Sequence, residues 1–185
     1  MRKLVKALCL IFVLCISLCV FACDVGLDHP KPTADEYFEV ELVGTSYAIS
    51  AKEGVELPSE IILPSEIDGK KITKIADYGF ANTDITKMAI PEGYTEIGAY
   101  AFQNCFKLTT VEIADTVKKL LQGAFSGCTA YKNTLYIPDS VEYIGNECFE
   151  LCTSLSVVSI PKNCIQGIDL AKGVEEALRI EARNK

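Results

Sequence analysis

A single spacing of hydrophobic residues recurs through the middle of the chain. Successive units begin 23, 24 and 23 residues apart, at Ile90, Ile113, Ile137 and Ile160. In the first three units, an aliphatic residue, a phenylalanine and a cysteine then follow in the same order. They are Ile97, Phe102 and Cys105 in the first unit, Leu120, Phe125 and Cys128 in the second, and Ile144, Phe149 and Cys152 in the third. A divergent unit before them supplies Ile75, Phe80 and Thr83. This self-similarity over about 100 residues identifies a tandem repeat.

Each unit also contains a stretch in which apolar and polar residues alternate. Val111 and Ile113, for example, flank Glu112. A period of two is typical of a strand with one buried and one exposed face. One unit cannot bury its apolar side alone, whereas stacked units form a continuous core. The pattern therefore predicts a mostly β solenoid of about 4–5 coils over residues 63–164, with parallel strands on one face.

The ends of a solenoid need covering, because terminal coils otherwise present open strand edges and apolar core. Residues 37–62 contain two strand-like segments around Gly44 and Thr45, which predicts an N-terminal β-hairpin cap. Residues 165–185 would form the C-terminal cap. There, Leu170, Val174 and Leu178 recur at helical spacing and favour a helix over residues 169–183, with an edge strand at residues 177–180 as the alternative.

The repeat resembles a known family. The segment Leu108-x-x-Val111-x-Ile113 matches the opening Leu-x-x-Leu-x-Leu of leucine-rich repeats. The fuller pattern, Ile-Pro-x-x-Val-x-x-Ile-Gly-x-x-Ala-Phe-x-x-Cys-x-x-Leu-x-x-Val-x-Ile, resembles the BspA-type subfamily. The chain departs from proline, leucine and alanine, respectively, at Ala114, Tyr131 and Cys148. The resemblance implies a leucine-rich-repeat solenoid that acts in adhesion or protein–protein interaction.

The N-terminus has a different character. Arg2, Lys3 and Lys6 precede a run of 16 residues from Ala7 to Ala22 that is apolar except for Ser17. A basic region followed by a short apolar region is typical of a secretory signal. As a helix the run would reach about 24 Å, less than the ~30 Å of a hydrocarbon core. We therefore expect residues 1–22 to be removed on export.

The residues Val20-Phe21-Ala22-Cys23 resemble the bacterial lipoprotein box, from which Phe21 departs. This resemblance implies lipid attachment at Cys23 and anchoring to the membrane in the cell envelope. Residues 23–36 show no apolar periodicity and would form a flexible tether. Ordinary cleavage after Ala22, which would give a secreted protein, is the alternative.

Composition excludes several classes of function. Eighteen basic against 25 acidic residues give a formal charge of −7, which argues against a nucleic-acid binder that relies on bulk charge. Removal of residues 1–22 deletes three basic residues and no acidic ones, which gives −7 − 3 = −10. The single histidine, His29, rules out a multi-histidine metal site and leaves little for Ser-His or Cys-His catalysis. We expect no enzyme activity, cofactor or metal.

Cysteine is the one residue class that could carry chemistry. Cys105, Cys128 and Cys152 recur once per unit and would form a column in the stack. A linear column does not bring four ligands together as zinc requires, so we expect buried packing thiols. A thiol-based redox protein is an alternative function. Cys148, beside the column, is the best candidate for a disulfide, and Cys164 falls on a core position.

The exposed side of the parallel strands is the expected binding face. Its first column would contain Lys87, Thr110, Thr134 and Val157, and its second column Ala89, Glu112, Tyr136 and Ser159. Small residues dominate this face, which makes Tyr136 the expected anchor. The expected partner is a protein on a host or neighbouring cell surface. A structural spacer in the cell envelope remains a further alternative.

Overall fold

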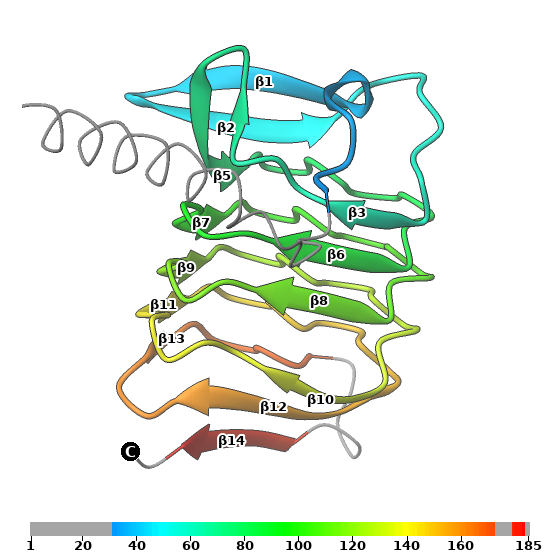
Figure 1. Ribbon diagram of the computed structural model, residues 1–185. Coiled ribbons are helices and arrows are strands. Elements are labelled where there is room, and N and C mark those ends of the chain that lie inside the picture. Colours follow the sequence, from blue (N-terminus) through cyan, green and yellow to red (C-terminus); the bar gives the residue numbers. More distant parts are fainter. Residues whose placement is uncertain (1–30, 173–178, 184–185) are drawn as a thin grey trace, which may run out of the picture. The chain divides into compact units, whose positions relative to one another are not determined.

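The computed structural model describes residues 31–172 and 179–183. The chain divides into two compact units, Met1–Lys31 and Pro32–Lys185. The predicted signal segment, Cys23, His29 and most of the tether lie outside the described residues. The second unit consists of short strands joined by turns and stacked in successive coils, from β1 at one end to β14 at the other (Figure 1).

One side of the solenoid carries six parallel strands. Three of them form one sheet, namely β3 (Glu60–Ile62), β6 (Lys87–Ile90) and β8 (Thr110–Ile113). The other three form a second sheet, namely β10 (Asn133–Tyr136), β12 (Leu155–Pro161) and β14 (Arg179–Arg183). Inward residues such as Met88, Val111 and Leu135 are buried, as period-two alternation predicts. We call the outward side of β3, β6, β8, β10 and β12 the strand face.

A second side is a longer ladder, whose last four strands contain only two residues each. It runs through β2 (Ser46–Ala51), β5 (Lys70–Ile75), β7 (Glu96–Ile97), β9 (Lys119–Leu120), β11 (Tyr143–Ile144) and β13 (Ile165–Gln166). β4 (Glu66–Ile67) pairs antiparallel with β5. Ile75, Ile97, Leu120 and Ile144 recur here, and all four are buried. These are the aliphatic positions of the repeat.

The third side consists of the turns that contain the repeated phenylalanines. We call residues 77–82, 99–104, 122–127, 146–151 and 168–172 together the turn face. Each phenylalanine N–H donates to a carbonyl of the next turn, as Phe80 does to Ala101 (2.8 Å). The rings of Phe80, Phe102, Phe125 and Phe149 stack in the core with centroids 5.9, 5.2 and 6.1 Å apart. The phenylalanine column is therefore a continuous seam of buried rings.

The N-terminal end is covered by a hairpin. β1 (Phe38–Val43), which follows a short 3₁₀-helix (Asp35–Tyr37), pairs antiparallel with β2 along its whole length. Phe38 is buried and its ring meets that of Phe80 edge-on at 6.2 Å. The hairpin thus extends the phenylalanine seam by one ring and closes the first coil.

The C-terminal end corrects the prediction of a helix. Residues 179–183 form strand β14, which pairs parallel with β12 from Val157–Arg179 to Pro161–Arg183. Ile180 and Ala182 alternate with charged residues, and pairing with β12 satisfies the strand edge. Val174 and Leu178, on which the helix prediction depended, lie outside the described residues. With β14, the stack has about six turns rather than 4–5.

Candidate functional site

The strand face aligns the predicted binding residues in two columns. In the first sheet, β6 pairs with β8 so that Lys87 lies beside Thr110 and Ala89 beside Glu112. In the second sheet, Thr134 lies beside Val157 and Tyr136 beside Ser159. The two columns are thus present within each sheet. No ladder pairs β8 with β10, so the columns are interrupted at the junction of the sheets.

The exposure of these residues differs strongly along the face. Tyr136 is 68% exposed, Lys87 and Glu112 are exposed, and the rest of the two columns is half-buried except for Ser159. The Lys87 ammonium forms an ion pair with the Glu60 carboxylate of the preceding coil (2.8 Å). Such an exposed ion pair contributes little to stability.

Ser159 is a correction. Its exposed fraction is only 6%, so it does not belong to the exposed surface on which the sequence placed it. In the ladder it lies between Tyr136 on β10 and Glu181 on β14. A small side chain between two long ones on adjacent strands is screened from water by its neighbours. The accessible part of the second column therefore ends at Tyr136.

The junction between β8 and β10 has a specific side-chain contact. Tyr131, buried in the leucine position of the repeat, accepts a hydrogen bond on its hydroxyl oxygen from the Val111 N–H (3.4 Å). Burial raises the pKa of Tyr131, which keeps the phenol neutral. The phenol thus takes the place of a strand carbonyl at the break. Sequence analysis missed this role, although the 24-residue unit and the leucine-to-tyrosine departure mark the same place.

The cysteine column occupies the turn side of the core. The thiols of Cys105, Cys128 and Cys152 are buried, and each donates to the carbonyl oxygen of the phenylalanine in the preceding coil. The distances from sulfur to oxygen are 3.0, 3.2 and 3.0 Å, to Phe80, Phe102 and Phe125 respectively. Thr83, the equivalent residue of the first coil, donates its hydroxyl to the Phe80 carbonyl of its own turn (2.8 Å), so this carbonyl accepts from both Thr83 and Cys105. Each thiol of the column thus adds a hydrogen bond between its coil and the preceding one.

Burial also controls the chemistry of these thiols. It raises the pKa of Cys105 and Cys128, and that of Cys152 to about 12. Burial likewise raises the pKa of Cys148, which lies in the alanine position. All five cysteines among the described residues are free thiols, so the disulfide suggested for Cys148 is not formed. A buried, protonated thiol is a poor nucleophile and a poor metal ligand.

No group of three or more histidine, cysteine, aspartate or glutamate residues in the described part of the chain could hold a metal ion. None of the described helices is long and apolar enough to cross a membrane.

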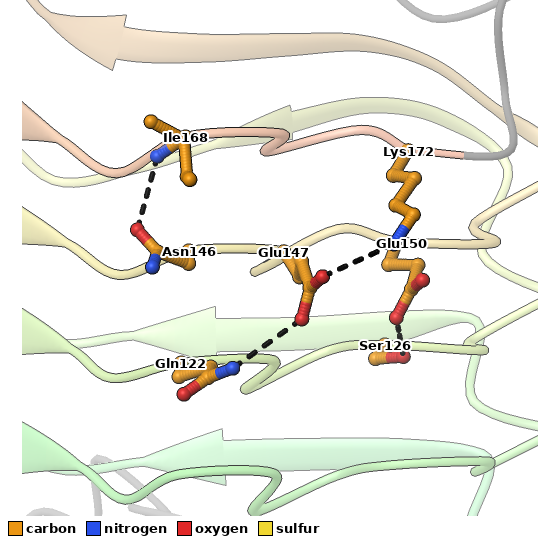
Figure 2. Close-up of polar contacts among 7 residues, drawn as sticks. All are labelled: Gln122, Ser126, Asn146, Glu147, Glu150, Ile168 and Lys172. Carbon is orange, nitrogen blue, oxygen red and sulfur yellow. Dashed lines mark hydrogen bonds and ion pairs between the residues drawn. The ribbon is translucent and has the colours of Figure 1, made fainter.

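A polar network braces the C-terminal half of the turn face (Figure 2). The Glu147 carboxylate accepts a hydrogen bond from the Gln122 amide (3.3 Å) and pairs with the Lys172 ammonium (3.4 Å). The Ser126 hydroxyl contacts the Glu150 carboxylate at 3.4 Å. These contacts link three successive turns, and each acidic group is already engaged with a neighbouring coil. We therefore assign this network to coil stacking.

Comparisons with known proteins agree with this architecture. The model of the BspA type leucine rich repeat region matches in six copies over residues 73–170. No curated protein gives a match. A solved leucine rich repeat protein from T. pallidum has a TM-score of 0.73 at 25% identity, covering 81% of this chain and 71% of that one.

Two further solved structures extend the comparison. A leucine-rich repeat protein from Bacteroides ovatus has a TM-score of 0.69 at 24% identity, covering 82% of this chain and 41% of that one. A leucine rich cell surface protein from Faecalibacterium prausnitzii has a TM-score of 0.54 at 20% identity, with 85% and 56% covered. The chain thus spans about half of these two proteins. Because the family model covers more than half of its 185 residues, the chain belongs to the BspA-type leucine-rich repeat family.

Proposed function

We propose that this chain is a non-enzymatic cell-surface protein that binds another protein through the strand face. The observation that carries the proposal is Tyr136, 68% exposed on a parallel β-sheet. A large aromatic side chain held in water by a rigid sheet presents apolar surface that a partner can bury. Tyrosine is among the residues that dominate the binding energy of protein interfaces.

The surroundings of Tyr136 support the same use. Two short, half-buried side chains lie nearby. Thr134 is two residues earlier on the same strand, and Val157 lies beside Thr134 on β12. A partner can therefore approach the strands closely around the ring and exclude water from it. A residue that dominates the binding energy of an interface is usually a large side chain surrounded by smaller contacts.

The location is part of the proposal. Export, lipid attachment at Cys23 and a tether of residues 23–36 would hold the solenoid away from the membrane, where its strand face can meet a protein on a host or neighbouring cell. The description of the Faecalibacterium prausnitzii relative as a cell surface protein supports this location.

A matched pair of variants tests the strand face. Tyr136→Ser removes the proposed anchor, whereas Phe106→Ser removes an aromatic side chain that is 59% exposed outside the strand face. Proteins captured from surface extracts would be quantified by mass spectrometry for each variant. We expect Tyr136→Ser to lose at least about tenfold of the specific capture, the scale of one dominant contact. Equal capture by both variants and the unaltered protein would rule out Tyr136 as the anchor, and no specific capture by the unaltered protein would favour a structural spacer.

Lipid attachment has its own test. Metabolic labelling with a fatty-acid analogue in a bacterial host should mark the unaltered chain and leave Cys23→Ser unmarked. Equal labelling of the two proteins would show that residues 20–23 act as an ordinary cleavage site.

A further inference from the structure

The ladder of backbone bonds on the turn face is open at its N-terminal end. At every junction between successive turns, three N–H groups donate to three carbonyls of the next turn. In the first turn the equivalent carbonyls belong to Asp77, Gly79 and Ala81. Gly79 accepts from the Ala51 N–H (2.7 Å), whereas the carbonyls of Asp77 and Ala81 take no hydrogen bond from the described residues.

A groove of about 520 Å³ lies at this open end. It is lined by residues 51–53 and 55–57, from the end of β2 onward, and by residues 78, 79 and 81–84 in and after the first turn. Tyr78 and Ala81 both line it, so an aromatic residue and a residue with an unpaired carbonyl contribute to the same groove. Backbone acceptors of this kind favour a ligand that brings hydrogen-bond donors.

The charges lining the groove also favour a ligand that brings hydrogen-bond donors. The charged residues of the groove are three acids, Glu53, Glu56 and Asp84, against one base, Lys52. Asp84 is paired with Lys107 (2.8 Å), but Glu53 and Glu56 form no ion pair among the described residues. Carboxylates and carbonyls accept hydrogen bonds and attract cations, so the groove is complementary to a cationic donor.

Tyr78 adds a geometric preference. One face of its ring stacks on Tyr100, with centroids 5.2 Å apart and planes 14° from parallel. The side chain is still 57% exposed, which leaves the rest of the ring available to the groove. Its left-handed backbone (φ 57°) belongs to the repeated turn, because Tyr100, Gly123 and Glu147 occupy the same position with φ of 55°, 59° and 55°.

From these observations we propose that the groove binds an arginine side chain of a basic, extended segment of another protein. The planar guanidinium stacks on the exposed face of Tyr78, and its N–H groups donate to the Ala81 carbonyl and to the carboxylates of Glu53 and Glu56. Arginine is favoured over lysine because only a planar, multiply donating cation can stack and donate at the same time. This second binding surface is separate from the strand face.

The test uses two fluorescent peptides, hexa-arginine and hexa-lysine, of equal charge. Fluorescence anisotropy on the purified protein should show hexa-arginine binding about fivefold or more tightly than hexa-lysine, the scale of one cation–aromatic contact. Tyr78→Asn removes the ring and keeps a residue that tolerates the left-handed backbone. We expect it to abolish the difference between the peptides. Amide shifts in an NMR titration should centre on residues 51–57 and 78–84.

Two further variants keep the result interpretable. Glu56→Gln, at an exposed position, should weaken hexa-arginine binding even if Tyr78→Asn lowers stability. Phe106→Ser, an exposed aromatic outside the groove, should leave it unchanged. Equal affinity for both peptides, a preference that survives Tyr78→Asn, or shifts spread over the acidic surface would each overturn the proposal. None of these measurements depends on the strand face, so Tyr136→Ser should bind hexa-arginine normally.

Discussion

The turn face and the strand face are built by the same coils, yet only the turn face is continuous. On the turn face, each of four successive junctions carries the same three backbone bonds, from residues 78, 80 and 82 to those from 147, 149 and 151. On the strand face, the ladder stops between β8 and β10 and resumes with β12 and β14. The hydrogen bonding between coils is therefore continuous on the turn face and interrupted on the strand face.

The cause is one extra residue. Tyr131 follows Leu108 by 23 residues, whereas Ile137 follows Ile113 by 24, so the extra residue lies between Tyr131 and Ile137. It falls at the entrance to β10, where the pairing with β12 also shifts between Asn133 and Thr134. The turn side has no room for such an insertion, because its phenylalanines and thiols fill the core. This insertion thus lies on the side on which we place the partner.

The first way to test this contrast is to break the continuous side. Phe125→Ala removes a ring that stacks between Phe102 and Phe149. We expect a loss of about 3–5 kcal/mol in the free energy of unfolding, through lost burial and a residual cavity. Urea unfolding followed by circular dichroism measures it, and exposed Phe106→Ala should cost less than about 0.5 kcal/mol. A loss below about 1 kcal/mol for Phe125→Ala would mean that the seam does not hold the coils together.

The thiols give a pH-dependent test of the same side. Burial raises the pKa of Cys152 from an ordinary 9.0 to about 12. A group whose folded pKa is raised contributes stability that is fully present below about pH 9 and is lost as pH rises towards 12. Stability should therefore fall over this range, and Cys152→Ala should show a smaller fall.

Alkylation of the native protein distinguishes packing thiols from redox thiols. The folded chain should react slowly with iodoacetamide at neutral pH, and quickly once denatured, because its thiols are buried and protonated. If mass spectrometry shows that one of Cys105, Cys128 or Cys152 is modified within seconds in the native state, a redox function would gain support.

A substitution at the junction between β8 and β10 should have a smaller effect on stability. Tyr131→Phe keeps the buried ring but leaves the Val111 N–H without its acceptor. We expect a loss of about 1 kcal/mol, the usual value of such a hydrogen bond. Hydrogen exchange should become faster at Val111 and stay unchanged at Phe125, whose N–H donates across the turn face to Cys148 (2.9 Å). Unchanged exchange at Val111 would show that the phenol does not support the junction.

The sequence could predict the features that follow from burial of the same positions in every repeat. The family, the parallel strands and the stacked phenylalanines all follow from hydrophobic spacing, because each coil buries the same positions. The C-terminal strand could not be predicted with the same certainty. Its short apolar pattern is compatible with helix or strand, and its partner β12 lies about 20 residues away.

Details of the candidate sites were harder to predict for a different reason. The burial of Ser159 depends on the sizes of Tyr136 and Glu181 on neighbouring strands, and the bond made by Tyr131 depends on where a ladder fails. The groove beside Tyr78 forms between a turn of the repeat and residues 51–57, which follow the hairpin outside the repeat. No periodic pattern records a contact of that kind.

The smallest expected effect on stability is at Tyr136, and the size of this effect distinguishes a structural role from a role in binding. Because its side chain is 68% exposed, Tyr136→Ser removes almost no buried surface, and the free energy of unfolding should change by less than about 0.5 kcal/mol. Urea midpoints of the variant and the unaltered protein measure this directly. A loss above about 1 kcal/mol would make the tyrosine a structural cover for Ser159 and β12 rather than an anchor. Unchanged stability together with lost partner capture would assign the ring to recognition, and would place binding on the interrupted side of the solenoid.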